Sequence, residues 1–154
     1  YLALDYSNAY ASLYTPGVGW SDPQEIDTTD TDVALVRGGA DSNGNVVALW
    51  QQDGRLVSRT LRSGVWGATQ DVTGSGTQLV VAGGSGGSAF AAWEQIDNGT
   101  PSIWFARYDG SAWGAAAPVE TNAGTAGMPD VSTHTGAAAV FAWQQTDGVW
   151  ATRR

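Results

Sequence analysis

One pattern recurs along this chain and constrains its fold more than any other feature: an apolar run that ends near a tryptophan, a short turn, and a second strand-like run. The first full copy spans 46–59 and is divided by Asp53-Gly54. Asp-Gly between two such runs predicts a β-hairpin, because a tight type I′ turn requires positive φ at its central residues. The pattern returns at 89–107 and 140–153, with predicted turns at Asp97-Asn98-Gly99 and Asp147-Gly148. The chain is therefore predicted to be a repeat protein.

Three series of marker residues predict a single repeat register. They are Trp20, Trp66 and Trp113; Arg59, Arg107 and Arg153; and Trp50, Trp93 and Trp143. An aliphatic residue also follows each member of the first series six positions later, at Ile26, Val72 and Val119. Spacing varies most in the third series, and we assign that variation to loops.

Each period contains four strand candidates, designated A to D from the inside outward. Strand A is expected at 33–36, 79–82 and 129–132, B at the Trp50, Trp93 and Trp143 runs, C at the runs ending in Arg59, Arg107 and Arg153, and D at 24–26, 69–72 and 118–120. No helical periodicity occurs, because the apolar runs are short and bounded by glycine. Four short strands in a repeat of about 47 residues are typical of β-propeller blades, in which neighbouring sheets cover one another.

The predicted fold is thus an all-β propeller, a partial or open ring of four-stranded antiparallel blades. Residues 1–30 are assigned to strands B, C and D of a first blade, 31–75 and 76–122 to two complete blades, and 123–154 to strands A, B and C of a fourth. Because the two ends duplicate strands B and C, they are not expected to merge into one blade. The expected partners are further blades of the same chain or another protein chain that completes the propeller.

The composition excludes some classes of partner. The net charge is −8 and all seven basic residues are arginine, so binding to the anionic backbone of nucleic acid is not expected. No apolar run reaches the roughly 20 residues of a membrane span, so membrane insertion is not expected. The chain has no cysteine and hence no disulfide or thiol chemistry. A low charged fraction with abundant Gly, Ser, Thr and Trp favours a secreted or cell-surface protein.

The stretch 43–54 resembles the repeats of secreted bacterial β-propeller proteins, and it is loosely similar to the Asp-box repeats of sialidase-like propellers. Asp41, Gly44 and Trp50 carry the second similarity. The full Asp-box order of Ser/Thr, Asp, Gly, Thr and Trp is not met, and the other two repeats lack the aspartate. The resemblance covers nearly the whole chain and implies a propeller fold. An active sialidase would also imply an arginine triad and a Tyr/Glu pair, to which no residue of this chain is assigned.

Metal and histidine chemistry have few candidate residues. His134 is the one histidine and is expected to be an exposed turn residue, because no nucleophile motif adjoins it. Zinc needs three or four His, Cys or carboxylate ligands, so zinc is not expected. The acidic residues Glu25, Asp27, Asp30 and Asp32, and the stretch 41–45, offer oxygen ligands for Ca²⁺, but neither matches a twelve-residue EF-hand loop. A solvated turn is the favoured interpretation, and Ca²⁺ binding at 27–32 stays open.

Glu94 and Asp97 are two nearby carboxylates, the residue type that a glycosidase uses as its catalytic pair. Such a pair must face one cleft at a set separation of about 5–10 Å. Gln51 and Gln144 stand at the positions equivalent to Glu94, which favours a variant of a polar repeat position. Asn98-Gly99-Thr100 is a formal glycosylation sequon and is interpreted as a hairpin turn.

Arginine, tryptophan and glutamine recur once in each repeat and are the candidate ligand-binding groups. The candidates are Arg59, Arg107, Arg153, Trp104, Trp150, Gln52, Gln95 and Gln145. An arginine fork binds sugar hydroxyls and an aromatic face stacks on a sugar ring. The alternative is structural, with each arginine bonded to carbonyls of a neighbouring blade, and repetition in every blade favours it.

The sequence therefore predicts a non-catalytic, secreted or cell-surface propeller that acts as a binding or structural interaction module. No enzyme activity and no cofactor are expected. The alternatives are a carbohydrate-binding lectin with one Trp/Arg site in each blade, and a non-catalytic portion of a secreted glycoside hydrolase.

Overall fold

The protein consists of short antiparallel sheets arranged in chain order. The structure is a computed structural model that describes residues 7–72, 74–121, 123–134 and 138–154. Its elements are β1 (Tyr10–Ala11), β2 (Tyr14–Thr15), β3 (Gly19–Trp20), β4 (Gln24–Glu25), β5 (Val33–Ala40), β6 (Val46–Gln52), β7 (Arg55–Arg62), β8 (Val65–Trp66), β9 (Gln70–Asp71), β10 (Thr77–Gly83), the 3₁₀ turn η1 (Ser85–Gly87), β11 (Ala89–Asp97), β12 (Thr100–Tyr108), β13 (Ala117–Pro118), β14 (Ala126–Thr133), β15 (Ala139–Gln145) and β16 (Gly148–Arg153). No α-helix occurs in these ranges, so the all-β prediction is confirmed.

We name β1–β4 repeat 1, β5–β9 repeat 2, β10–β13 repeat 3 and β14–β16 repeat 4. The sheets of repeats 3 and 4 are meanders of consecutive strands, and repeat 2 follows the same order up to β8. Repeat 3 has the order β10-β11-β12-β13, repeat 2 has β5-β6-β7 with both β8 and β9 paired to β7, and repeat 4 has β14-β15-β16. In repeat 1, β1 pairs with β4 and β2 pairs with β3. The described strands form separate sheets and do not close into a ring.

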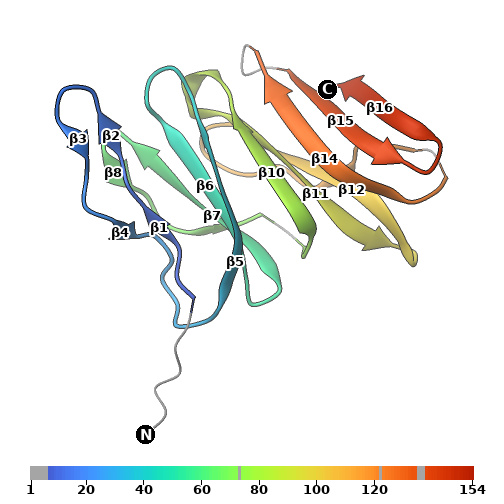
Figure 1. Cartoon of the computed structure of the whole chain (residues 1–154), viewed down its shortest axis with the longest axis horizontal. Helices are drawn as coiled ribbons and strands as arrows, with labels where there is room; N and C mark the ends of the chain where they lie inside the picture. Colours follow the sequence, from blue (N-terminus) through green and yellow to red (C-terminus); the bar gives the residue numbers. More distant parts are fainter. Residues whose placement is uncertain (1–6, 73, 122, 135–137) are drawn as a thin grey trace, which may run out of the picture.

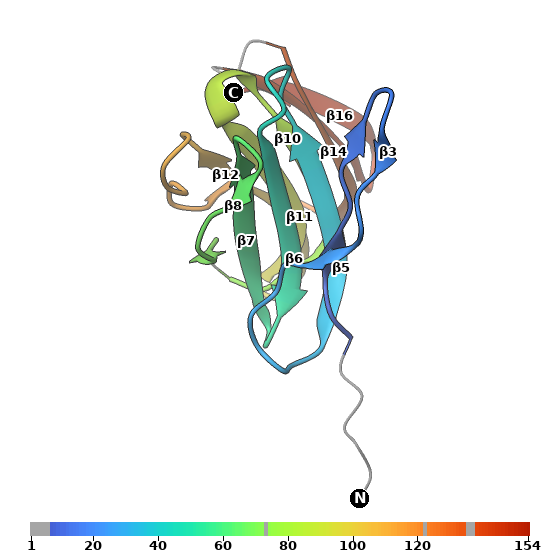
Figure 2. The same cartoon turned by 90° about the vertical axis from the view of Figure 1, so that its left-hand side faces the viewer.

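The sheets stand side by side, from β1–β4 at one end of the molecule to β14–β16 at the other (Figure 1). Viewed from the repeat 1 end, β5, β6 and β7 lie next to one another in one sheet (Figure 2). The first strands of the last three repeats pack against one another, since β10 contacts both β5 and β14. In repeats 2, 3 and 4 the turns between the second and third strands lie at the same end of the sheets, which we call the hairpin end (Figure 1).

Two of the three predicted hairpin turns have the predicted backbone. Asp53 and Gly54 have φ of 51° and 71°, and Asn98 and Gly99 have φ of 48° and 84°, as a type I′ turn requires. In repeat 4 the prediction is off by one residue, because Gly148 already pairs with Gln145 as the first residue of β16. The turn there is residues 146–147 and not Asp147-Gly148.

Three apolar clusters lie between neighbouring sheets and hold them together. Trp50 packs against repeat 1, Trp93 against repeat 2 and Trp143 against repeat 3, and their exposed fractions are 0%, 0% and 5%. Because side chains alternate between the two faces of a strand, the residues before and after each tryptophan face the next repeat. Repeats 2 and 3 are therefore covered by a neighbouring repeat on both faces.

Strand pairing corrects the predicted register of the arginine series. Trp93 is opposite Trp104 and Trp143 is opposite Trp150, whereas Trp50 is opposite Val57. Arg107 and Arg153 lie three residues beyond those partners, but Arg59 lies only two beyond Val57. Arg59 therefore faces the opposite side of its sheet, and Thr60 is the true equivalent of the other two arginines.

A β-bulge repeats in the first strand of repeats 2, 3 and 4. Its leading residue is Leu35, Gln78 or Met128, with φ of 55°, 52° and 52°. In each case two residues of the first strand oppose the single buried tryptophan of the second strand. Such a bulge bends the strand and increases its twist, at the cost of a left-handed backbone at a non-glycine residue.

Candidate ligand site between the repeats

The predicted glutamines hold the buried tryptophans in place. The Trp50, Trp93 and Trp143 indoles donate to Gln52, Gln95 and Gln145 Oε1 at 3.0, 3.1 and 3.2 Å. Gln52 Nε2 also donates to the Thr29 and Thr31 carbonyls, both at 3.1 Å. A residue two positions after the tryptophan lies on the same face of the strand, which is why this spacing repeats. Gln52 and Gln145 are only 5% and 4% exposed, so they offer little surface to a ligand.

The predicted arginines have different environments. Arg59 Nη1 donates to the Ile26 carbonyl of the preceding repeat at 3.1 Å, and its Nε donates to Gly67 O at 2.6 Å. Arg107 is exposed, and its guanidinium lies 5.8 Å from the Phe90 ring centroid. Arg153 is exposed on β16. Arg154 donates to the Val119 carbonyl at 2.8 Å, a cross-repeat bond that the sequence did not predict.

The two tryptophans in the predicted site also differ. Trp104 is half-buried, and its buried indole N–H has no partner among the described residues. Trp150 is 40% exposed and donates to Asp147 Oδ1 at 3.1 Å. The structure thus does not gather arginine, tryptophan and glutamine into one recurring site.

The acidic stretches are bonded to backbone N–H groups. Asp27 Oδ1 accepts from Ala9 N at 2.8 Å, and Asp32 Oδ1 accepts from Ser7 N at 3.1 Å. Asp27 is 5% exposed, so the expectation of a wholly solvated turn is wrong at this residue. Within the described ranges, no three or more His, Cys, Asp or Glu side chains are grouped so that they could hold a metal ion.

Asp41 organises the turn at the other end of repeat 2. Its carboxylate accepts from the backbone of Asn43, Asn45 and Gly87 and from the Asn45 side chain. Partial burial alone would raise the pKa of Asp41, but these hydrogen bonds outweigh it and hold the pKa below its ordinary value. The Gly87 bond links repeat 2 to repeat 3. In the turn between β12 and β13 of repeat 3, hydrogen bonds from Ala112 and Ser111 lower the pKa of the exposed Asp109 to about 2.

Glu94 and Asp97 do not form a catalytic pair. They are three residues apart on β11, so they point to opposite faces of the strand. Asp97 is exposed and accepts from Asn98 at 3.1 Å, at the hairpin turn. His134 is exposed, as predicted.

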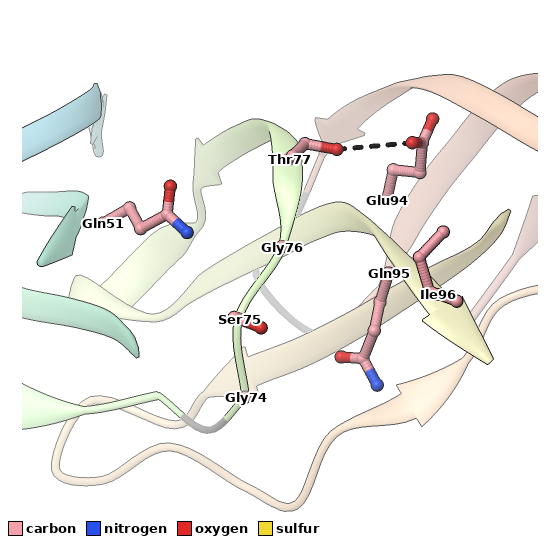
Figure 3. A pocket seen from close by; sticks show the side chains of 8 residues that line it. All are labelled: Gln51, Gly74, Ser75, Gly76, Thr77, Glu94, Gln95 and Ile96. Atoms are coloured by element: carbon pink, nitrogen blue, oxygen red, sulfur yellow. Dashed lines mark hydrogen bonds between the residues drawn. The ribbon is translucent and has the colours of Figure 1, made fainter. Parts of the chain in front are cut away.

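A cleft opens between repeats 2 and 3 at the hairpin end. This cleft, cleft I, has a volume of about 440 Å³ and is lined by Gln51, Gly74, Ser75, Gly76, Thr77, Glu94, Gln95 and Ile96. Figure 3 shows Gln51 reaching from repeat 2 toward the segment that leads into β10, with Glu94 and Gln95 pointing away from each other on β11. The side chains offer amides, hydroxyls and one carboxylate.

An equivalent cleft lies between repeats 3 and 4. Cleft II has a volume of about 360 Å³ and is lined by Gln78, Glu94, Thr125, Ala126, Gly127, Met128, Gln144, Gln145 and Thr146. Aligned on the buried tryptophans, 74–77 corresponds to 124–127 and 94–96 to 144–146. The two clefts are therefore one feature of the repeat, and Glu94 lines both.

Glu94 is at the centre of a hydrogen-bond network across these clefts. It accepts from Gln78 Nε2 at 2.8 Å and from Thr77 Oγ1 at 3.3 Å. Gln78 Oε1 in turn accepts a hydrogen bond of 2.5 Å from the backbone N–H of Met128, the bulge residue of the next repeat. The sequence identified the Gln51, Glu94 and Gln144 positions as equivalent. It gave no signal for Thr77 and Gln78, because their role depends on the bulge.

The comparisons with known proteins add no family. A scan against protein-family models finds no match, and a search of curated proteins finds no relative. In the part of the chain that the structure describes, no helix is long and apolar enough to cross a membrane.

Proposed function

We propose that the chain is a non-catalytic binding module built from propeller-type blades, and that clefts I and II are its ligand sites. The observation that carries the proposal is the repetition of one cleft at two successive repeat interfaces, lined by hydrogen-bonding side chains that mostly lie outside the buried core. Repeated clefts with amide and hydroxyl linings suit recognition of an extended partner at several points.

The propeller assignment is supported by the order of strands in each repeat. Repeat 3 is a four-stranded meander, its neighbours follow the same order, and each sheet buries its tryptophan face against the preceding sheet. We further propose that units of the same kind, from this chain or another, cover the faces that the outer repeats leave bare. We also propose that the protein is secreted or displayed on the cell surface, and this part of the proposal is supported by composition alone.

The lectin alternative is less well supported, because its glutamines and Arg59 bond within the fold. Arg153 and the partly exposed Trp150 remain available on the last repeat.

Blocking a cleft tests the function. The chain is screened against peptide and glycan arrays, beside a Ser75→Trp variant that fills cleft I and a Ser42→Trp control in an exposed turn at the opposite end. We expect saturable binding that Ser75→Trp weakens and Ser42→Trp leaves unchanged. Equal binding by all three proteins would remove cleft I from the function.

A further inference from the structure

We propose that cleft II binds a cationic side chain of an extended polypeptide, with the Glu94 carboxylate pairing with a lysine or arginine head group. This inference rests on the proposed function at the same cleft and adds the class of ligand. Glu94 is suited to the role because it lines cleft II beside Gln78 and is half-buried, so an ion pair there is less screened than on open surface.

The carboxylate retains acceptor capacity for a ligand. Each oxygen of Glu94 accepts one side-chain hydrogen bond, from Thr77 and from Gln78. An ionised carboxylate has about four lone-pair sites, so each oxygen can accept a further N–H. The two existing bonds fix the orientation of the carboxylate, which reduces the entropy lost when a cation binds.

The charge around the clefts is mostly negative. The turns and connections at the hairpin end carry the charged residues Asp27, Asp30, Asp32, Asp53, Glu120 and Asp147, and no basic residue. Arg55, which begins β7 beside the Asp53-Gly54 turn, is 3.6 Å from the Asp71 carboxylate. Clefts surrounded by one sign of charge attract ligands of the other sign and raise their rate of association.

The cleft walls favour an aliphatic stem over a sugar ring. Ile96 in cleft I and Met128 in cleft II are 62% and 70% exposed, and they offer apolar contact near the carboxylate. Lysine and arginine bury their methylene stems on such surfaces while the charged head stays polar. Among the residues that the structure describes, neither cleft is lined by an aromatic side chain on which a sugar could stack.

The test is fluorescence anisotropy of a labelled peptide of alternating serine and lysine, titrated with the full chain. Glu94→Gln removes the charge while placing in repeat 3 the residue that repeats 2 and 4 have at this position. Asp22→Asn is the matched control, because it removes one negative charge at an exposed residue outside both clefts. Circular dichroism verifies that each variant is folded.

We expect salt-sensitive binding that is lost when the peptide lysines are acetylated. Glu94→Gln should weaken it about tenfold or more, as removal of a charge-assisted hydrogen bond does, and Asp22→Asn should not. Equal affinity for wild type and Glu94→Gln, or equal losses in both variants, would overturn the inference. Preferential binding of a chitosan oligomer would overturn the assignment to a polypeptide.

The two proposals can fail separately. If another ligand binds and Ser75→Trp blocks it while Glu94→Gln does not, the clefts keep their function and the cationic ligand is wrong. If neither peptides nor glycans bind the folded chain, both proposals are wrong.

Discussion

Single buried side chains account for much of the stability of each repeat interface, and tryptophans allow a direct comparison. Trp143 is 5% exposed, whereas Trp20 is 72% exposed beside Tyr14. Trp143→Ala is expected to lower the free energy of unfolding by about 3–5 kcal/mol, through lost burial and the cavity left behind. Trp20→Ala should cost less than about 1 kcal/mol. Urea unfolding measures both, and equal losses would contradict this ranking of burial.

The glutamine after each buried tryptophan provides a second comparison, between adjacent residues. Gln52→Leu leaves the Trp50 indole N–H and the carbonyls of Thr29 and Thr31 without their partner. Unsatisfied buried polar groups cost about 1–3 kcal/mol, so a loss of that size is expected. Gln51→Leu is the control, because that side chain lines cleft I on the other face of β6. If chemical denaturation gave the two variants the same stability, the structural role of Gln52 would be wrong.

At the scale of the element, the repeated bulge is the feature that shapes each sheet. Met128 has φ of 52° and is 70% exposed, so its side chain contributes little packing to offset the backbone cost. Met128→Gly is expected to raise the free energy of unfolding by up to about 1 kcal/mol, because glycine adopts this conformation without steric cost. Met128→Val should lower it, since a β-branched residue is least suited to positive φ. Thermal unfolding in which Val proved more stable than Gly would contradict this account.

The strands were predictable from sequence because their signals are local. Alternating apolar runs and Asp-Gly or Asn-Gly turns place the B and C strands, and the periodic tryptophans identify the buried face. The bulges were not predictable, because Leu35, Gln78 and Met128 share no residue type that signals positive φ. The arginine register was misassigned because Arg59 lies one residue earlier in its strand than Arg107 and Arg153 do in theirs. A shift of one residue places a side chain on the opposite face of the sheet.

The candidate site was predictable only in part. Repetition in the sequence identified the glutamines two residues after each buried tryptophan as candidate ligand-binding residues. They recur because each one bonds to the indole of that tryptophan within the fold. The clefts arise where two sheets meet, so their lining comes from segments far apart in the chain, such as Gln51 and Ser75. Only the substitution of Glu94 for a repeated glutamine gave a signal in the sequence, as a departure from the repeat.

At the scale of the whole molecule, equivalent positions have unequal environments. Phe90 and Ile103 on repeat 3 are 2% and 0% exposed beneath repeat 4. Their equivalents on repeat 4, Val140 and Val149, are 49% and 82% exposed. The same face that forms an apolar interface in repeat 3 is bare in repeat 4, and among the described strands β16 has no partner on its outer edge. Bare apolar faces and open strand edges both favour association.

We therefore expect the 154-residue chain to associate with copies of itself or with another protein that covers repeat 4. Burial of each valine side chain would contribute about 1.5–3 kcal/mol to such an interface. Sedimentation velocity over a concentration series should show association, and Val149→Lys should reduce it by placing a charge in the interface. Val18→Lys is the control, because Val18 is 85% exposed in a turn of repeat 1. A well-folded wild-type monomer at every concentration, with both outer faces in water and no partner bound, would contradict the prediction, as would equal loss of association in the two variants.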